Sequence, residues 1–295
     1  YRNCGDTAMK RALILVNAYS KLQHSLNQSE RLRAELARLG VDAEIRHNDF
    51  FISSIDGDGN LTADTREDDF CIYLDKDKYV SEMLEKSGLR LFNSSTAIAD
   101  CDDKMITSIR LSGHGIPLPA TLPGLLCYDP AEPIREETLD RIEARLGYPL
   151  IAKESYGSLG KGVYKIDHRA ALRDVAERLK CKPHLFQAFV GSSFGRDIRV
   201  IVIGGQCVAA MIRQSNGDFR SNLELGGVGT PMTPSPELKT LCERVAAVLR
   251  LDYCGIDVLF GENGYLICEV NSNAFFGGIE SVTHINIAER YARYI

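Results

Sequence analysis

The chain has 295 residues, of which 44% are hydrophobic and 25% are charged, and its formal net charge is −5. This length and apolar content are sufficient for a large core and predict about two domains. The negative charge argues against general nucleic-acid binding, which needs a basic face, although a few Lys and Arg could still form a local basic cleft. No apolar run approaches the roughly 20 residues that a membrane-spanning helix needs, so no membrane partner is expected.

The cysteines and the first residues predict a cytoplasmic location. The nine cysteines include no pair with Cys-x-x-Cys spacing, and most of them, such as Cys71, Cys207 and Cys268, lie in apolar runs. This pattern is typical of reduced core thiols in a cytosolic protein. The first residues also lack the long apolar stretch of a secretory signal. Met9 resembles a natural start, so residues 1–8 are treated as an added or frayed extension.

The N-terminal part of the chain predicts a βαβ unit. Residues 13–16 form an apolar run of strand length, a leucine pattern of helical period follows and stops at Gly40, and residues 43–46 can form a second strand. A βαβ opening implies a parallel sheet with helices on its faces. Further strands are predicted at residues 70–74 and 90–93, with a helix at residues 80–86.

A polar segment at residues 51–69 interrupts this unit. Its turn at residues 56–60, Asp-Gly-Asp-Gly-Asn, is typical of a hairpin tip. The alternative is a calcium-binding EF-hand loop, but the later ligands and the terminal Glu of such a loop are missing. The segment is therefore predicted to form a hairpin.

The rest of the chain alternates helices and strands. Residues 100–113 are predicted as one helix, and five prolines between residues 117 and 133 then mark the change from the first domain to the rest. Further helices are predicted at residues 136–146, 170–179 and 238–249 and from about residue 286. Further strands are predicted at residues 150–153, 162–166, 185–190, 198–203, 207–213, 253–260 and 265–270.

Three oxygen-bearing residues near the end of the chain form the strongest candidate site. Glu269 and Asn271 are two apart on a predicted strand, so their side chains point to the same face, and Asp257 on the preceding strand can lie opposite them. Two carboxylates and an amide oxygen suit Mg²⁺. Acids at the mouth of a buried sheet also need a cation partner. The spacing alone leaves a solvated strand face with ordinary acids as an open alternative.

A glycine-rich loop follows the strand that ends at Lys153. Gly157, Gly160 and Gly162 would let backbone N–H groups approach phosphate oxygens. The loop is not a Walker A loop, because Gly-x-x-x-x-Gly-Lys-Ser/Thr is not matched. It is not a Rossmann turn either, because its glycines do not open a helix. Its position between two strands favours a phosphate-covering flap, and an ordinary hairpin loop is an equally open alternative.

A cluster of basic and amide side chains lies between these two features. Arg196, Asp197 and Arg199 open a strand, Arg213 ends the next strand, and residues 218–222 read Asp-Phe-Arg-Ser-Asn. Arg binds phosphate and carboxylate oxygens in a bidentate way, so this cluster favours a clamp for a transferring phosphoryl group. Surface ion pairs, such as Asp197 with its Arg neighbours, are the open alternative. No Gly-x-Ser-x-Gly elbow or other nucleophile motif is present.

These three features, in this order, resemble the ATP-grasp superfamily. Within it the chain is most similar to the RimK-like carboxylate–amine ligases, the group that includes ribosomal protein S6 glutamate ligase and LysX. The resemblance covers roughly residues 95–295. It rests on residues 103–104, Lys153 with its glycine loop, and residues 187–190, 195–199, 217–222, 255–258 and 269–271.

The resemblance implies an α/β fold with two parts. The first, residues 1–94, would be a βαβ domain with a parallel sheet on the substrate side. The second, residues 95–295, would be a two-subdomain ATP-grasp fold of α+β type. Its lid subdomain would cover about residues 118–189, and its metal-binding subdomain residues 190–295.

The resemblance also implies roles for the candidate residues. Lys104 and Lys153 would contact the α- and β-phosphates of ATP, and Asp197 would contact the ribose. The flap over the γ-phosphate would contain Gly157, Ser158, Gly160 and Gly162. The hinge that reads adenine through its backbone would contain Gln187, Ala188, Phe189 and Val190. Many relatives have an acid where Ala188 stands, so any side-chain role there would be lost.

The remaining implied roles concern the reacting groups. Arg220 and Asn222 would bind the γ-phosphate and the acyl phosphate, and Arg199 would complete the catalytic set. Arg213 and Ser221 would belong to the nucleotide site. Asp257, Glu269 and Asn271 would hold Mg²⁺ or Mn²⁺, and two ions are expected.

The implied reaction has two steps. A substrate carboxylate attacks the γ-phosphorus of ATP and yields an acyl phosphate and ADP, and an amine then displaces phosphate to form an amide. The expected partners are ATP and a carboxylate and an amine from an amino acid such as glutamate, a peptide or a protein tail; a homo-oligomer is compatible with the resemblance. A non-catalytic ATP-binding regulatory or scaffold module and a small-metabolite kinase are the alternatives. The first domain, residues 48–69 and residues 273–278 are expected to line the acceptor cleft.

Overall fold

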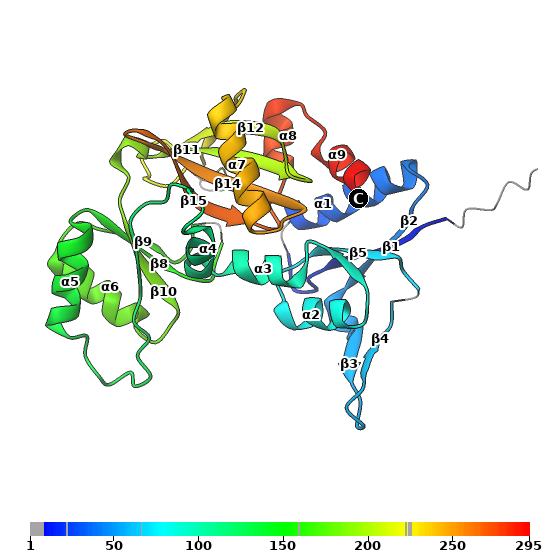
Figure 1. Ribbon diagram of the computed structural model, residues 1–295, viewed down its shortest axis with the longest axis horizontal. Coiled ribbons are helices and arrows are strands. Elements are labelled where there is room, and N and C mark those ends of the chain that lie inside the picture. The colour runs from blue at the N-terminus through cyan, green and yellow to red at the C-terminus, as the bar shows by residue number, and fades with distance from the viewer. Residues whose placement is uncertain (1–8, 22, 66, 159, 222, 224–225) are drawn as a thin grey trace, which may run out of the picture.

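The computed structural model describes residues 9–295 apart from residues 22, 66, 159, 222, 224 and 225. In this described part, the strands form two four-stranded sheets, one five-stranded sheet and one two-stranded hairpin. Figure 1 shows the lobes of the first and second sheets at opposite ends of the molecule. One parallel sheet followed by antiparallel sheets confirms the predicted α/β fold class.

The first sheet is parallel, with the strand order β2-β1-β5-β6. Its strands are β1 (Arg11–Val16), β2 (Asp42–His47), β5 (Phe70–Leu74) and β6 (Arg90–Phe92), connected through α1 (Gln23–Arg38) and α2 (Lys78–Lys86). β1 and β5 are nearly continuous apolar runs because both faces of these central strands are buried. The predicted βαβ opening is therefore confirmed.

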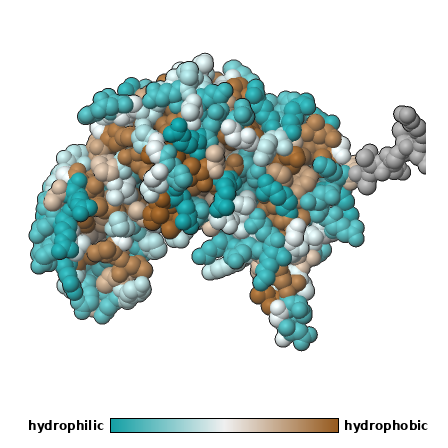
Figure 2. All heavy atoms as spheres, in the orientation of Figure 1, coloured by the Kyte–Doolittle hydropathy of each residue, from teal (hydrophilic) through white to brown (hydrophobic). Residues whose placement is uncertain are grey.

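A hairpin projects from the lobe of the first sheet. It consists of β3 (Ser53–Ile55) and β4 (Leu61–Ala63), which pair antiparallel. The Asp56 carboxylate holds its turn by accepting hydrogen bonds from the backbone N–H groups of Asp58 and Asn60, at 3.0 and 2.8 Å. Figure 2 shows apolar side chains along the hairpin and hydrophilic side chains at its tip. The hairpin prediction is confirmed.

The prediction of a single helix at residues 100–113 is wrong. The segment forms α3 (Ser95–Asp102) and α4 (Lys104–Leu111), and Asp103 between them has an extended backbone. The Asp103 carboxylate accepts hydrogen bonds from the N–H groups of Met105 and Ile106, at 2.9 and 3.1 Å. A side chain that caps a new helix in this way competes with continuation of the old one. The break places Lys104 in the first turn of α4.

The second sheet is antiparallel, with the order β7-β10-β8-β9. Its strands are β7 (Thr121–Pro123), β8 (Leu150–Glu154), β9 (Val163–Ile166) and β10 (His184–Ala188), and its helices are α5 (Glu136–Leu146) and α6 (Arg169–Leu179). Leucines from both helices pack with Leu150 and Phe186 of the sheet in one core. The expected strand at residues 185–190 ends at Ala188, so Phe189 and Val190 lie in the connection that follows.

The third sheet is antiparallel, with the order β13-β12-β11-β14-β15. Its strands are β11 (Arg196–Ile203), β12 (Gln206–Gln214), β13 (Val228–Pro231), β14 (Tyr253–Gly261) and β15 (Gly264–Asn271). α7 (Pro236–Val248) packs on one face of this sheet. β13 and the later α8 (Gly277–Thr283) were not expected, because both segments are short and glycine-rich.

The C-terminal helix α9 (Ile287–Tyr294) packs beside α1 (Figure 1). Asn286 links them, because its side chain donates to Glu35 at 3.1 Å and accepts from Arg31 at 2.9 Å. One apolar core contains residues of the first sheet, α1, the third sheet and α9. The shared core holds the first sheet against the third. None of the helices in the described ranges has the length and apolar character needed to cross a membrane.

Candidate nucleotide and metal site

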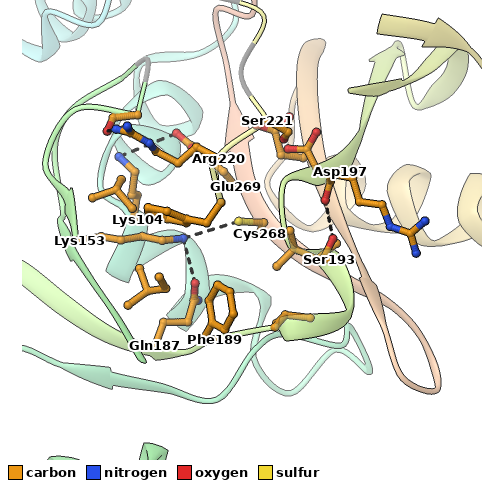
Figure 3. A pocket seen from close by; sticks show the side chains of 18 of the residues that line it. Lys104, Lys153, Gln187, Phe189, Ser193, Asp197, Arg220, Ser221, Cys268 and Glu269 are labelled. Carbon is orange, nitrogen blue, oxygen red and sulfur yellow. Dashed lines mark hydrogen bonds and ion pairs between the residues drawn. The ribbon is translucent and has the colours of Figure 1, made fainter. Parts of the chain in front are cut away.

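A cavity lies between the second and third sheets (Figure 3). Its volume is about 860 Å³, including the solvent-filled space at its open mouth. The sequence-predicted residues that line it are Lys104, Lys153, Gly157, Ser158, Gly160, Gln187, Ala188, Phe189, Val190, Asp197, Arg220, Ser221, Asp257 and Glu269. Gly162, Arg199, Arg213 and Asn271 lie outside its lining. Asn222 is not among the described residues. The structure thus brings together most residues that were expected at a nucleotide site.

The two lysines reach the cavity from different elements and have different partners. Lys104 donates from Nζ to the Gly157 carbonyl at 2.8 Å and lies 3.8 Å from Glu269 Oε1. Burial lowers the pKa of Lys104, and the negative charge of Glu269 only partly offsets this effect. Lys153 on β8 donates to Gln187 Oε1 at 2.9 Å and lies 3.6 Å from Cys268 Sγ. Both ammonium groups are therefore held at the cavity wall.

The connection after β10 forms one wall of the cavity. The Gln187 side chain is fixed at both ends, because its amide nitrogen donates to Thr121 Oγ1 at 3.0 Å while its oxygen accepts from Lys153. Phe189 and Val190 lie past the end of the strand and outside its hydrogen-bond ladder. The Phe189 ring packs edge-on against Phe194, with centroids 6.3 Å apart. An apolar wall next to non-ladder backbone groups can accommodate a flat heteroaromatic ring.

The glycine loop closes the cavity on the side of the second sheet. Gly157, Gly160 and Gly162 all have positive φ, between 69° and 138°, a conformation that residues with a Cβ rarely adopt. Arg220 contacts this loop from the opposite wall, because its Nη1 donates to the Gly160 carbonyl at 3.0 Å. Asp218 holds the same guanidinium at 2.8 Å, and hydrogen bonds from Arg220 lower the pKa of Asp218. The Arg220 guanidinium therefore lies at the point where the glycine loop covers the cavity.

The predicted metal residues sit as the hairpin geometry requires. Asp257 is the register partner of Glu269, and Gly255 is the partner of Asn271. All three oxygen-bearing side chains border a second cavity, which adjoins the first at Asp257 and Glu269. The described residues contain no group of three or more His, Cys, Asp or Glu that could hold a metal. The candidate site instead combines two carboxylates, those of Asp257 and Glu269, with the amide oxygen of Asn271. That donor set fits a hard cation such as Mg²⁺.

The ion pairs of the third sheet are buried and cross-strand, unlike the surface pairs that the sequence left as an open alternative. Arg213 donates to Asp197 at 2.8 Å and lies 2.9 Å from Asp257, while Arg199 donates to Asp257 at 3.0 Å. Burial raises the pKa of Asp257, but the charges of Arg199 and Arg213 outweigh it and hold the pKa at about 2. For Asp197, burial outweighs the attraction of Arg213, so its pKa is raised. Asp257 is therefore ionised at neutral pH.

The sequence analysis did not assign several residues of the cavity lining to the site, and Cys268 is the one whose predicted role the structure changes. Cys268 was interpreted as a core thiol, yet it lines the cavity next to Glu269. The cause is a bulge, because Asp257 pairs with Glu269 while Val258 already pairs with Ile267. At a bulge, two consecutive side chains can face the same side. Strand alternation gives no signal for such a shift.

Residues 101–295 match the family model described as the RimK-like ATP-grasp domain. The chain therefore belongs to the RimK-like ATP-grasp family. It is 36% identical over 223 residues to N-acetylaspartylglutamate synthase A of Homo sapiens, which corresponds to 75% of this chain and 56% of that protein. It is also 34% identical over 219 residues to a Maridesulfovibrio salexigens protein named "Probable alpha-L-glutamate ligase", covering 73% of this chain and 70% of that protein.

The fold resembles that of D-alanine–D-alanine ligase from Bacillus anthracis, solved in complex with ATP. The TM-score is 0.73, with 98% of this chain and 96% of that chain covered, and the sequences are 16% identical. At this identity, the similarity concerns the fold alone. The chain spans only 56% of the length of the human relative.

Proposed function

We propose that this protein is a Mg²⁺-dependent, ADP-forming ligase that joins a carboxylate to an amine through an acyl phosphate. The observation that carries the proposal is one cavity in which two lysines, a glycine loop and Arg220 converge on the acidic pair Asp257 and Glu269. Such a set of cations and metal-binding acids is suited to phosphoryl transfer. The family to which the chain belongs supports the same chemistry.

Each group of residues would bind a different part of ATP. The backbone at Phe189 and Val190 would bind the adenine, Asp197 and Ser221 would lie near the ribose and phosphates, and Lys104 and Lys153 would neutralise the α- and β-phosphates. Gly157, Ser158 and Gly160 would cover the γ-phosphate together with Arg220. Mg²⁺, held by Asp257, Glu269 and Asn271, would neutralise charge on the phosphate oxygens. We propose that two ions bind at this site.

The bonds change in two steps. First, a carboxylate oxygen forms a bond to the γ-phosphorus, the bond to ADP breaks, and Arg220 stabilises the charge on the transferring group. Then the amine nitrogen forms a bond to the carbonyl carbon, and the carbon–oxygen bond to phosphate breaks. Two protons leave the former ammonium, one with phosphate and one to solvent. This chemistry needs no side-chain nucleophile.

The names of the relatives suggest glutamate as the amine substrate. The carboxylate would be an N-acylated amino acid, a di- or tricarboxylate, a peptide or a protein tail. The division at residue 94, the lid at residues 118–189, the cytoplasmic location and a homo-oligomer stay predictions that accompany this proposal.

The proposal is tested by ADP and phosphate release with L-glutamate and a panel of these carboxylates, with products identified by mass spectrometry. We expect a condensed product whose mass equals the two substrates minus water. Glu269→Gln combined with Asn271→Ala is expected to abolish amide formation. Unchanged amide formation in that double variant would refute the metal site.

Two other outcomes would replace the proposal. Tight Mg-ATP binding without ADP release with any substrate would indicate a non-catalytic module. A stable phosphorylated product would indicate a kinase.

A further inference from the structure

The second cavity lies between the first and third sheets. Its volume is about 1020 Å³, measured with its open mouth. Asn17, Leu74 and Asp75 of the first sheet's lobe form one wall, and Asp257 and Glu269 belong to the other. A molecule in this cavity would therefore lie between the metal candidates and the carboxyl ends of parallel strands.

The position of Asp75 in the first sheet is one at which ligands commonly bind. The chain runs from β1 through α1 to β2 on one side of β1, and from β5 through α2 to β6 on the other. The neighbours β1 and β5 therefore flank a topological switch point, where a crevice opens at the carboxyl ends of the strands. Asn17 follows β1, and Asp75 follows β5.

The hydrogen bonds around Asp75 come from neutral groups only. Asn17 Nδ2 donates to its two oxygens at 3.2 and 3.1 Å, Asn48 Nδ2 donates at 3.0 Å, and the Lys76 backbone N–H donates at 2.8 Å. Burial raises the pKa of Asp75, and the hydrogen bonds from Lys76 and Asn17 only partly offset this effect. These four hydrogen bonds come from two amide groups and one backbone N–H, so none of the donors supplies a positive charge to compensate the carboxylate.

The other charges of this cavity are balanced by opposite charges. Arg199 pairs with Asp257, Lys76 pairs with Asp102 at 3.0 Å, and Glu269 lies 3.8 Å from Lys104. In the part of the chain that the structure describes, no Lys, Arg or His forms such a pair with Asp75. A half-buried carboxylate without a cation is costly, and a cationic ligand group would remove that cost.

The neighbours of Asp75 select an ammonium group over a metal ion. A metal site would need further oxygen ligands, but both amide groups direct N–H toward Asp75. Their oxygens are engaged elsewhere, because Asn17 Oδ1 accepts from the Tyr19 N–H at 2.8 Å and Asn48 Oδ1 accepts from the Ala18 N–H at 2.9 Å. An ammonium group needs only acceptors and brings the positive charge that the neutral donors around Asp75 lack.

We infer that Asp75, oriented by Asn17 and Asn48, binds the ammonium group of the amine substrate. The substrate nitrogen would then face Glu269 across the cavity. This inference rests on the proposed function, because it assigns the second substrate of that reaction. The amine must reach the acyl carbon from outside the nucleotide cavity, and the second cavity adjoins that cavity at Asp257 and Glu269. The substrate class is therefore a primary amine that is cationic at neutral pH.

The test separates the two steps of the reaction. Hydroxylamine is a small neutral nucleophile that traps an acyl phosphate as a hydroxamate without needing an ammonium site. Asp75→Asn is expected to raise the KM for L-glutamate at least tenfold, while hydroxamate formation from the same carboxylate and the KM for ATP stay within twofold. Asp75→Glu, which keeps the charge, is expected to recover part of the loss.

The matched control is Asp49→Asn. Asp49 is an exposed carboxylate next to Asn48, and it does not line the cavity. The KM values of the Asp49→Asn variant for L-glutamate and ATP are therefore expected to equal those of the unchanged protein. An unchanged KM for L-glutamate in Asp75→Asn would overturn the inference. Loss of hydroxamate together with amide would overturn it too, because Asp75 would then act in carboxylate activation.

A comparison on the unchanged protein keeps the inference testable if the variants do not fold. Glutarate, which is L-glutamate without its amino group, is expected to inhibit amide formation with an inhibition constant at least tenfold above the KM of L-glutamate. Equal values would overturn the inference. If the unchanged protein forms neither hydroxamate nor amide with any carboxylate, the proposed function itself fails, which is a distinguishable result.

Discussion

The lobes of the second and third sheets both contain an arginine network, but the two networks have opposite environments. On α5 and α6, Arg169 pairs with Glu136, Asp140 and Glu143, carboxylates whose side chains are 35–65% exposed. In the third sheet, Arg213 pairs with Asp197 and Asp257, and these side chains are at most 11% exposed. Water screens the first network and cannot screen the second. The exposed pairs therefore join two helices weakly, while the buried pairs keep Asp257 ionised at the candidate metal site.

The largest effect is expected for Asp257→Asn. This change leaves the guanidinium groups of Arg199 and Arg213 buried beside a neutral amide, so the free energy of unfolding should fall by about 3 kcal/mol or more. ADP release should also be lost, because a candidate metal ligand is removed. Urea unfolding and an ADP assay measure the two effects. The matched control is Asp140→Asn in the exposed network, which should change neither quantity appreciably. Equal destabilisation by the two changes would contradict the comparison.

Arg220 lies between these extremes, because its ion pair with Asp218 is about one-third exposed. Arg220→Met should lower the rate of ADP release by roughly 10²–10³-fold, since a preorganised cation next to the transferring group is removed. Stability should change little. The control is Arg290→Met, an exposed position on α9, which should turn over ATP at the original rate. A loss of stability as large as that of Asp257→Asn would show that Arg220 is mainly structural.

The smallest effect is expected in the exposed network, and it depends on pH. Hydrogen bonds from Arg173 and Arg169 lower the pKa of Glu136 from 4.5 to about 2. The folded protein therefore binds fewer protons than the unfolded chain between these values, so Glu136 stabilises the fold above about pH 4.5 and loses this effect as the pH falls through 2. Glu136→Gln should lower the melting temperature slightly at pH 7 and less at pH 3. A constant difference between the two pH values would contradict this assignment.

The regular elements could be predicted because they follow from hydrophobic period. β1, α1 and β2 have clear patterns, and the hairpin of β14 and β15 places Asp257 opposite Glu269 by register alone. What failed depends on single side chains. Asp103 divides one predicted helix by capping a second one, and a bulge turns Cys268 toward the cavity. The Asp103 cap leaves the hydrophobic period unchanged. The bulge places the buried residues Ile267 and Val270 three apart, but the apolar residues around Ile267 hide this shift in the sequence.

The ion pairs inside the candidate site also could not be predicted from the spacing of residues in the sequence. Asp197 and Arg199 are two residues apart on β11, which suggests that they interact. They instead pair across strands, Asp197 with Arg213 and Arg199 with Asp257. Cross-strand register decides these partners, and register is a tertiary property. The Asp75 cavity has the same origin, because its two walls come from sheets that are distant along the chain.

The packing of α9 against α1 has a consequence for how the molecule is made. Asn286 and Glu35 are 251 residues apart in sequence yet share a hydrogen bond. During vectorial synthesis, β1, α1 and β2 emerge long before the segment that covers them, so their apolar surface stays exposed to chaperones and to other nascent chains. The core shared by the first sheet, the third sheet and α9 can therefore be completed only after translation has passed α9.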